Sequence, residues 1–312
     1  MTAQLLQIGA HTVHVTRPDK ILFPGERPLT KWDLVEYYRR IAGTMLPYVE
    51  GRPVTMQRFP DGIEGEGFFQ QDVPAYFPRW VARAMVAKEA GRVTHVLCQN
   101  AATLVYLADQ ACITPHVWLS RVDKPAHPDR LIFDLDPPDD DFGPVRTAAR
   151  LVRTLLGELG LSTYLMTTGS RGVHVVAPLD RTAVFDQVRA FVREAAVLLT
   201  HRHPRELTVE ARVAQRAGRL FLDTGRNAYA QTAVAPYAVR AKPGAPVATP
   251  LAWDELEDQT LTARTYRLDN MFERLEQTGD LWRGMARQAT SPTEARRQLA
   301  DLLKSEGATF GG

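Results

Sequence analysis

The order of the secondary-structure elements expected after residue 130 constrains the fold most. The patterns predict strand 131–136, helix 144–159, strands 163–167 and 173–177, helix 182–199 and strand 220–223. This βαββαβ order is that of ferredoxin-like and RNA-recognition sheets. In that topology the first and third strands are antiparallel neighbours, so the end of the first strand lies beside the start of the third.

Two carboxylates stand close together at the end of the first of these strands. Asp134 and Asp136 are separated by one residue, and strand side chains alternate between faces, so both point the same way while Phe133 and Leu135 face a core. Like charges side by side repel unless a cation lies between them, and hard oxygen ligands suit Mg²⁺ or Mn²⁺. The alternative is a solvated acidic turn after a strand that Pro137 ends.

The turn over residues 168–174 combines glycines with polar side chains. Its two glycines permit close backbone approach and exposed amide groups, Ser170 adds a hydroxyl, Arg171 a cation and His174 a hydrogen-bond donor. These groups suit a triphosphate, and the expected topology brings them to the same site as the acidic pair. The alternative is an ordinary hairpin turn with a hydrogen-bonded histidine.

Further charged residues follow this module. Asp223 ends an apolar run and could supply a third carboxylate, although element order alone does not set the register of its strand. Arginines 212, 216, 219 and 226 surround it and either neutralise phosphates or lie on a solvated face. Arg240 at a strand end is equally open to a phosphate-binding or a structural role.

Residues 1 to about 120 predict a mixed α/β lobe. We expect strands 5–8, 12–15, 53–59, 94–98 and 116–121, a helix that Thr30 caps at its start, and a helix over 101–112. Phe68 and Phe69 follow a glycine-rich loop, where an exposed ring would suit base stacking and core packing of at least one ring is the alternative. Lys20 and Lys31 flank a turn and could form a small anion site.

Composition narrows the class of protein. The chain has 312 residues, 45% of them hydrophobic, which is enough for a substantial core, and its net charge of +2 requires any nucleic-acid binding to come from local clusters. Its two cysteines suggest neither a disulfide framework nor a zinc knuckle. No leader or apolar run of about 18 residues is present, so we expect a soluble cytoplasmic protein with no membrane partner.

Taken together, these motifs resemble the polymerase domain of bacterial ligase D and its stand-alone relatives, members of the archaeo-eukaryotic primase superfamily. The likeness extends from residue 17 to about residue 281. It includes the segments 17–24, 51–53, 58–62, 129–137, 169–174, 236–247 and 253–256. Several separate motifs in the right order make the resemblance specific.

The resemblance implies an α/β (α+β) fold of the primase-polymerase type, in which the βαββαβ catalytic module packs against the N-terminal α/β lobe. We expect one catalytic domain over 1–290, with the lobe at 1–120, the module and its basic cluster at 121–262 and a helical part at 263–290. A C-terminal helix and a flexible tail would occupy 291–312.

The resemblance also assigns roles to residues. Two divalent ions, Mn²⁺ or Mg²⁺, would be held by Asp134, Asp136 and Asp223. The phosphates of the nucleotide would be bound by Ser170, Arg171, His174 and Arg240. DNA would be bound by Phe68 and Phe69 through base stacking, by Lys20 and Lys31 at a 5′-phosphate, and by Arg216 in a mobile loop. Arg171 departs from the family's usual lysine, and Gln70-Gln71-Asp72 stands where a basic residue is common.

The function implied is template-dependent extension of a primer 3′-hydroxyl from nucleoside triphosphates, filling gaps at DNA breaks during non-homologous end joining. The resemblance also implies a preference for ribonucleotides and a substrate of broken or gapped DNA with a 5′-phosphate. It further implies a DNA ligase and a Ku-type end-binding protein as partners, and a prokaryotic, nucleoid-associated location. No Lys-x-Asp-Gly motif is present, so this chain would not ligate alone. The alternatives are a primase in replication or damage tolerance, a metal-dependent phosphodiesterase using the same aspartates, and an end-binding module without catalysis.

Overall fold

The computed structural model describes residues 3–88, 91–137, 139 and 141–308, and the chain divides into two compact units. Unit 1 consists of Met1–Asp123, Thr232–Thr249 and Arg264–Asp280, and unit 2 of Lys124–Gln231, Pro250–Ala263 and Leu281–Gly312. Residues 232–249, which the sequence analysis placed in the 121–262 module, thus belong to unit 1. The reason is pairing: residues 232–234 form a strand of the unit 1 sheet.

Unit 2 is built on a six-stranded sheet with the strand order β13-β14-β10-β12-β11-β16. Its strands are β10 (Arg130–Asp136), β11 (Tyr164–Thr167), β12 (Val173–Pro178), β13 (Leu207–Thr208), β14 (Leu220–Asp223) and β16 (Pro250–Leu251). The two expected helices are α3 (Gly143–Glu158) and α4 (Phe185–Arg202). The first and third strands of the motif, β10 and β12, are antiparallel neighbours, which confirms the predicted topology.

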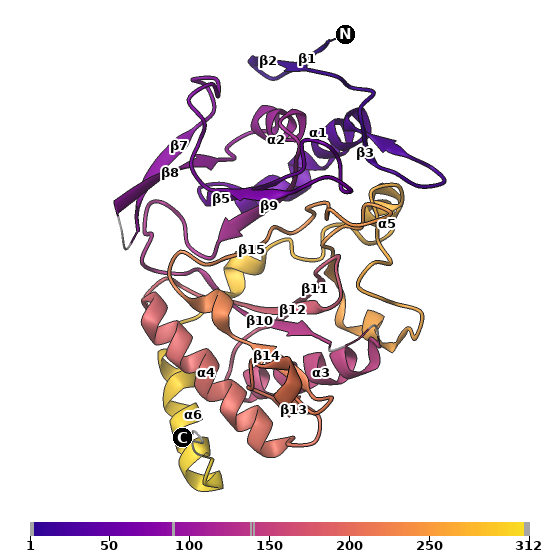
Figure 1. The fold of residues 1–312 in the computed structure, drawn as a ribbon. Coiled ribbons are helices and arrows are strands. Elements are labelled where there is room, and N and C mark those ends of the chain that lie inside the picture. The colour runs from indigo at the N-terminus through magenta and orange to yellow at the C-terminus, as the bar shows by residue number, and fades with distance from the viewer. Residues whose placement is uncertain (1–2, 89–90, 138, 140, 309–312) are drawn as a thin grey trace. The chain divides into compact units, whose positions relative to one another are not determined.

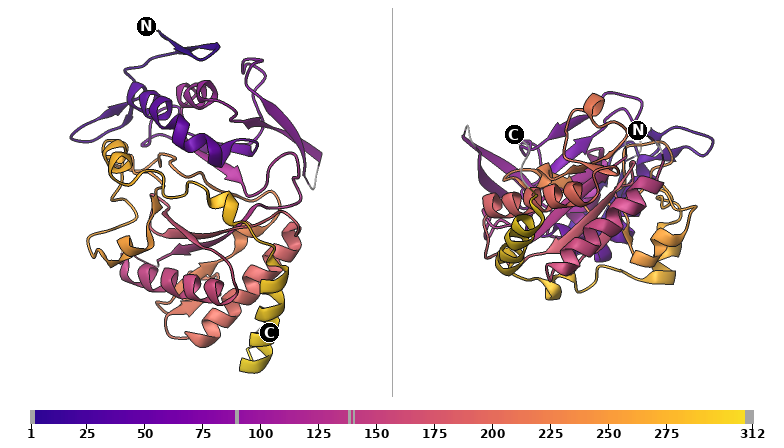
Figure 2. Two further views of the ribbon diagram at one scale, coloured as in Figure 1. Left: turned by 180° about the vertical axis from the view of Figure 1, so that it is seen from behind. Right: turned by 90° about the horizontal axis from the view of Figure 1, so that it is seen from below.

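Helices α3 and α4 lie on one face of this sheet (Figures 1 and 2). The buried face of α3 carries apolar residues at helical spacing, among them Val145, Ala148, Val152 and Leu156. Fully buried Phe133 on β10 belongs to this apolar layer, so its alternating neighbours point to the opposite face. Helix α6 (Pro292–Glu306) packs along α4. The predicted tail beyond residue 308 lies outside the described residues.

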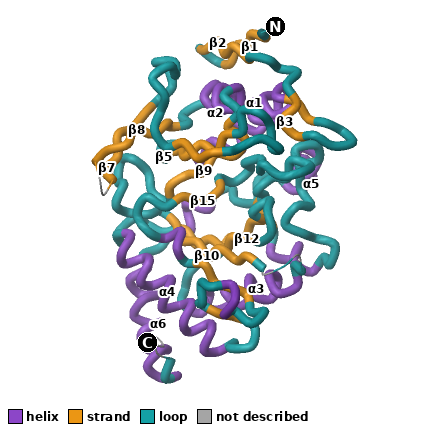
Figure 3. The backbone as a smooth tube through the Cα atoms, in the orientation of Figure 1, coloured by secondary structure: helices purple, strands orange, loops and turns teal. Residues whose placement is uncertain are grey.

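Unit 1 contains a second sheet with the order β15-β9-β5-β8-β7, to which β6 is added beside β5 (Figure 3). Its strands are β5 (Pro53–Arg58), β6 (Phe68–Gln70), β7 (Arg83–Lys88), β8 (Gly91–Leu97), β9 (Cys112–Trp118) and β15 (Thr232–Val234). Helices α1 (Lys31–Val49) and α2 (Ala101–Asp109) pack together, and Tyr38 of α1 donates a hydrogen bond to the Ile113 carbonyl of β9.

The remaining elements of unit 1 are short. They are the hairpins β1 (Gln4–Ile8) with β2 (His11–Val15) and β3 (Ile21–Phe23) with β4 (Leu29–Thr30), and the helix α5 (Met271–Thr278). None of the helices among the described residues combines the length and apolar character needed to cross a bilayer.

Two predicted boundaries in unit 1 had different outcomes. The cap at Thr30 is confirmed, because Thr30 and Asp33 form a reciprocal capping box at the start of α1. The helix predicted over 101–112 is wrong at its end: it stops at Asp109. Ala111 has a φ of 55°, which ends the helix, and Cys112 begins β9 four residues before the predicted strand.

Candidate active site

Strand register gathers the predicted acidic residues on one face of the unit 2 sheet. Asp134 on β10 faces Asp223 on β14 on one side and His174 on β12 on the other. Directly opposed residues of antiparallel strands project from the same face, with Cα atoms about 4.5–5.5 Å apart. Asp223, Asp134 and His174 therefore form a row across three strands, and Asp136 lies two residues along β10 on the same face.

A buried asparagine supports this register. Asn227, which is fully buried, accepts a hydrogen bond from the Ile132 backbone N–H at 2.9 Å and donates one to the Ile132 carbonyl at 2.7 Å. The Asn227 side chain thus continues the pairing of β10 beyond the end of β14. Asn227 could not be predicted as part of the site, because its only signal in the sequence is its place four residues after Asp223.

Of the three carboxylates, Asp134 has the negative charge that neighbouring side chains compensate most strongly. Its Oδ2 lies 3.2 Å from Nε of Arg226, and its Oδ1 lies 3.5 Å from Nε2 of His174. Burial alone would raise the pKa of Asp134, but His174 and Arg226 outweigh burial and lower this pKa to about 2. Asp134 is therefore ionised at neutral pH. From the sequence, Arg226 is predicted only as a member of a basic cluster, and its ion pair with Asp134 is a finding of the structure.

The other two carboxylates are less compensated. Partial burial, followed by the negative charge of Asp134, raises the pKa of Asp136. The guanidinium of Arg171 lies 3.9 Å from Asp136 Oδ2, and 42% of the Asp136 side chain is exposed. Asp223 accepts a hydrogen bond from the Gly225 backbone N–H at 2.7 Å. The face thus carries three negative side chains, of which Asp136 and Asp223 are free enough to accept a further cation.

The predicted phosphate-binding turn lies beside this row. Thr168 closes it, because its backbone N–H donates to the Gly172 carbonyl at 2.9 Å and its hydroxyl accepts from the Ser170 N–H at 3.3 Å. A Cβ at Gly172 would overlap the Leu135 carbonyl oxygen, so only glycine allows this close approach to β10. His174 Nδ1 is buried and has no hydrogen-bond partner in the described part of the chain. Such an atom indicates a site for a polar ligand.

These residues fit a divalent cation in donor type and strand register. Carboxylate oxygens are the ligands that Mg²⁺ and Mn²⁺ prefer. Within the ranges that the structure describes, no three histidine, cysteine, aspartate or glutamate side chains are grouped closely enough to hold a metal. Arg226 and His174 contact the two oxygens of Asp134, and Arg226 supplies a positive charge beside this carboxylate.

Arg216 lies at the same end of the sheet. Its guanidinium is 4.4 Å from the ring centroid of Phe221, and it donates hydrogen bonds to the carbonyls of Glu210 and Ala211. Phe221 faces Asp136 across the β10–β14 pair. The structure thus brings this predicted residue close to the acidic row, although its contact with DNA stays a prediction.

The other predicted site residues, Lys20, Lys31, Phe68, Phe69 and Arg240, belong to unit 1. Phe68 and Phe69 are 43% and 62% exposed on β6. The alternative that at least one ring packs in the core is therefore wrong, and both rings are accessible for stacking. The backbone N–H of Arg240 donates to the Pro246 carbonyl at 2.7 Å, and the phosphate-binding role of Arg240 stays a prediction.

The two lysines differ sharply in environment. Lys20 forms a surface ion pair with Asp61 at 2.6 Å. The side chain of Lys31 is only 5% exposed, and its ammonium lies 3.2 Å from Asp109 Oδ1 and donates to the Asp109 carbonyl at 2.9 Å. Burial is the main cause of the lowered pKa of Lys31. Its ammonium is therefore used inside unit 1, and a role at a 5′-phosphate stays a prediction for both lysines.

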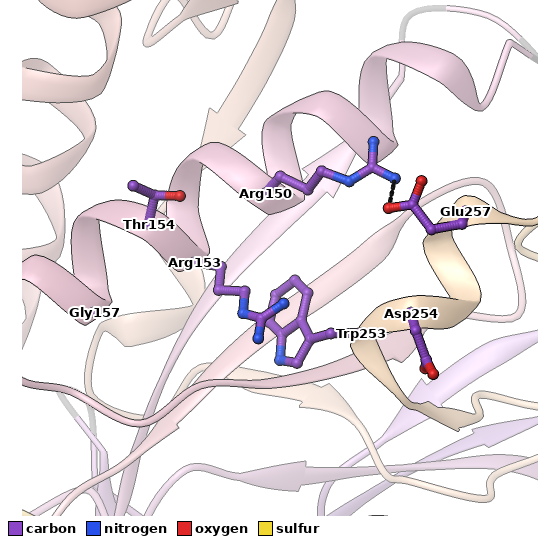
Figure 4. Close-up of a pocket in the computed structure, with 7 residues that line it drawn as sticks. All are labelled: Arg150, Arg153, Thr154, Gly157, Trp253, Asp254 and Glu257. Atoms are coloured by element: carbon purple, nitrogen blue, oxygen red, sulfur yellow. Dashed lines mark hydrogen bonds and ion pairs between the residues drawn. The ribbon is translucent and has the colours of Figure 1, made fainter.

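A hollow of about 750 Å³ lies between α3 and the 3₁₀ helix η3 (Trp253–Glu257) (Figure 4). The Arg153 guanidinium stacks 4.7 Å from the Trp253 ring, and Arg150 forms an ion pair with Glu257 at 2.7 Å. Because α3 belongs to the helical layer, this hollow is separate from the acidic row. None of the residues that line this hollow is predicted from the sequence as a site residue.

Comparison with known proteins decides the family. The family model described as LigD, primase-polymerase domain, matches residues 30–282. The chain belongs to this family. A solved structure, the polymerase domain from Mycobacterium tuberculosis ligase D in complex with DNA, is 33% identical and superposes with a TM-score of 0.83, covering 89% of this chain and 99% of that one. The predicted family and α/β fold class are thereby confirmed.

Curated relatives are longer proteins. The multifunctional non-homologous end joining protein LigD of Mycolicibacterium smegmatis is 33% identical over 294 residues, which cover 93% of this chain and 37% of the relative. The bifunctional LigD of Bacillus subtilis is 31% identical, with 85% of this chain and 42% of the relative covered. The chain thus spans about two-fifths of their length. The domain family is one of DNA-directed nucleotidyltransferases and implies dependence on a divalent metal.

Proposed function

We propose that this chain is a template-dependent nucleotidyltransferase that extends primer 3′-hydroxyl ends and fills gaps at DNA breaks during non-homologous end joining. One observation carries the proposal. The register of β14, β10 and β12 places Asp223, Asp134 and His174 in one row, with Asp136 and the 168–172 turn beside it. Phosphoryl transfer needs such a combination of acidic ligands and phosphate-binding groups.

The roles follow from the chemistry of the side chains. Ser170, Arg171 and His174 orient the triphosphate at the β12 side of the row, and the buried Nδ1 of His174 supplies a polar contact. Asp134, Asp136 and Asp223 would hold two divalent ions, Mn²⁺ or Mg²⁺, which when bound would lower the pKa of the primer hydroxyl and neutralise charge on the phosphates. The carboxylates therefore serve as ligands and not as general bases.

Partners and preferences complete the proposal. The M. tuberculosis structure is of a polymerase domain in complex with DNA, and the relatives are named for end joining. By analogy, this chain acts on gapped or broken DNA with a 5′-phosphate, prefers ribonucleotides, and works beside a DNA ligase and a Ku-type end-binding protein in a prokaryotic nucleoid. Phe68, Phe69, Lys20, Lys31, Arg216 and Arg240 are the proposed contacts to DNA and nucleotide.

The test is extension of a primer across a short gap in duplex DNA with a 5′-phosphate. Ribo- and deoxyribonucleotides are supplied separately, each with Mn²⁺, with Mg²⁺ and with a chelator. We expect ribonucleotides to be incorporated faster, and the chelator to abolish extension. Asp136→Ala should lose extension while it keeps affinity for the gapped duplex, because Asp136 holds cations and not the DNA backbone.

Asp254→Asn is the matched control. It removes an exposed carboxylate of the same unit that lies beside the hollow near α3, and we expect unchanged extension. The proposal fails if wild-type protein releases nucleotides from DNA without incorporating any, which would indicate a phosphodiesterase. Extension that starts equally well on unprimed single strands would instead favour a primase.

A further inference from the structure

The two partners of Asp134 differ in how firmly they are held. The His174 side chain is 4% exposed and lies on β12, which has a strand on either side, so its imidazole is fixed within the sheet. The Arg226 side chain is 41% exposed. An ion pair with a solvated member costs little to break, because water takes over the lost contacts of that member. Arg226 is therefore the partner that can leave Asp134 while the rest of the site stays in place.

The backbone of Arg226 is anchored on both sides. The N–H of Gly225, the residue before it, donates to Asp223 Oδ1 at 2.7 Å. The side chain of Asn227, the residue after it, bonds to both backbone groups of Ile132 on β10. Both neighbours are thus tied to the strands that carry the acidic row. Because the backbone is held and the guanidinium is half-exposed, a change of partner requires only rotation about the side-chain bonds of Arg226.

The burial of Asp134 sets the condition for such a change. Only 7% of this side chain is exposed, and a buried carboxylate that loses its cation is strongly destabilised. Arg226 can therefore leave Asp134 only when another cation takes its place. In the proposed function that cation is divalent, so the site gains positive charge while the displaced guanidinium is still close to it. The guanidinium then needs an anion.

A phosphate is the anion that the position and shape of this guanidinium suit. The donors of arginine form a planar fork that binds two phosphate oxygens at once. Arg226 and His174 contact opposite oxygens of Asp134, so the two side chains are separated by a single carboxylate. In the proposed function the triphosphate of the nucleotide contacts His174. A phosphate bound there is therefore within the reach of Arg226 once that side chain has left Asp134.

We infer that Arg226 couples cation binding to nucleotide binding, by pairing with Asp134 in the unliganded protein and with a phosphate of the nucleotide in the loaded one. This inference rests on the proposed function. Before the nucleotide arrives, Arg226 weakens cation binding, because it competes for Asp134. Once the cation is bound, Arg226 strengthens nucleotide binding. Cation and nucleotide therefore bind better together than either does alone, and by linkage each strengthens the other by the same factor.

The test measures both ligands on three variants. Arg226→Gln removes the charge, and Arg226→Lys keeps the charge but not the fork. Arg150→Gln is the matched control, because the Arg150 side chain is also 41% exposed and pairs with a carboxylate, that of Glu257, beside the hollow near α3. Binding of Mn²⁺ alone is measured from the paramagnetic resonance signal of the free ion. Binding of a non-hydrolysable ribonucleoside triphosphate is measured by calorimetry, with Mn²⁺ in excess and with a chelator.

Arg226→Gln should bind Mn²⁺ about 25-fold more tightly than wild type. Two unit charges in contact in water change an equilibrium about fivefold, and the double charge of the ion squares this factor. The same variant should bind the nucleotide about tenfold more weakly in Mn²⁺, because it lacks a hydrogen bond between charged groups. In the chelator its nucleotide affinity should be nearly unchanged. Arg226→Lys should bind Mn²⁺ as wild type does, and Arg150→Gln should match wild type in every measurement.

Thermal unfolding adds a measurement that does not require a stable metal-free variant: Mn²⁺ should raise the unfolding temperature of Arg226→Gln more than that of wild type. The inference is overturned if Arg226→Gln binds Mn²⁺ no more tightly than wild type. It is also overturned if the loss of nucleotide affinity is equal in Mn²⁺ and in the chelator, or if the variant loses affinity for gapped DNA instead of the nucleotide. Failure of the proposed function is distinguishable, because wild type would then neither bind Mn²⁺ nor extend a primer.

Discussion

Asp109→Asn should destabilise unit 1 far more than its conservative chemistry suggests. The substitution keeps the shape of the side chain but removes the only negative charge bound to the Lys31 ammonium among the described residues. Both side chains are almost fully buried, at 5% and 2% exposure. The remaining acceptors near the ammonium, the Asp109 carbonyl and the Thr16 hydroxyl, are uncharged.

The magnitude follows from the geometry. At 3.2 Å, two unit charges in an effective dielectric constant of about 20 attract by about 5 kcal/mol. Removing one partner of a buried pair typically costs about 3–5 kcal/mol, because the other charge stays buried without compensation. We therefore expect Asp109→Asn to lower the free energy of unfolding by about 3–5 kcal/mol.

Lys31→Met is the informative counterpart. It leaves Asp109 with hydrogen bonds from the Thr16 backbone N–H at 2.7 Å, the Thr16 hydroxyl at 3.1 Å and Gln110 Nε2 at 2.9 Å, so the carboxylate keeps three donors. The loss should be smaller, about 1–3 kcal/mol. The double variant should be more stable than Asp109→Asn alone, since no charge then stays buried unpaired. Urea unfolding of the four proteins measures all these differences.

The pH dependence has a definite sign. Burial lowers the pKa of Lys31 below its ordinary value of 10.5, so the folded protein releases this proton before the unfolded chain does. Asp109→Asn should therefore gain stability as pH rises toward 10.5, while the double variant shows no such gain. The reasoning is refuted if Asp109→Asn is as stable as wild type, or if Lys31→Met loses affinity for a 5′-phosphate without any loss of stability.

Three further predictions concern the acidic row. Asp136→Asn should stabilise the metal-free protein by up to about 1 kcal/mol in thermal unfolding, because it removes like-charge repulsion from a half-exposed site. It should also abolish the stabilisation of the protein by added Mn²⁺. Unchanged stabilisation by Mn²⁺ would contradict this prediction. Gly172→Ala should lower the free energy of unfolding by about 1–3 kcal/mol, measured in urea, because the added Cβ meets the Leu135 carbonyl. An unchanged free energy of unfolding would mean that the turn shifts freely. Asn227→Leu should increase hydrogen exchange of the Ile132 amide and reduce primer extension. Unaltered amide exchange would exclude Asn227 as a support of the β10–β14 register.

Element order in the sequence was sufficient to predict the centre of the site. In the βαββαβ arrangement the positions of the first and third strands follow from the connections between them. The prediction that the end of the first strand lies beside the 168–174 turn needed no knowledge of long-range contacts. The observed pairing of Asp134 with His174 confirms it.

The register of β14 against β10 could not be predicted from element order. Strand β14 has four residues, which is too short for a periodic signal to fix its alignment against β10. Its alignment is supported by the Asn227 side chain, which bonds to a backbone 95 residues earlier in the chain. The burial of Lys31 could not be predicted for a related reason. Its partner, Asp109, stands 78 residues away on another helix, so nothing local marked this lysine as buried.

The acidic row is positioned by contacts to the β10 backbone, separately from the ion pair of Asp134. Arg226 Nε lies 3.2 Å from Asp134 Oδ2, so in the proposed function a divalent cation would have to compete with Arg226 for this carboxylate. Placement of the row must then be independent of that ion pair. It is, because Asn227 and Gly172 act on the backbone of β10, through hydrogen bonds to Ile132 and through close approach to Leu135. A cation that replaced Arg226 in the proposed function would change the partners of Asp134, while the strand register that brings the carboxylates together would stay the same.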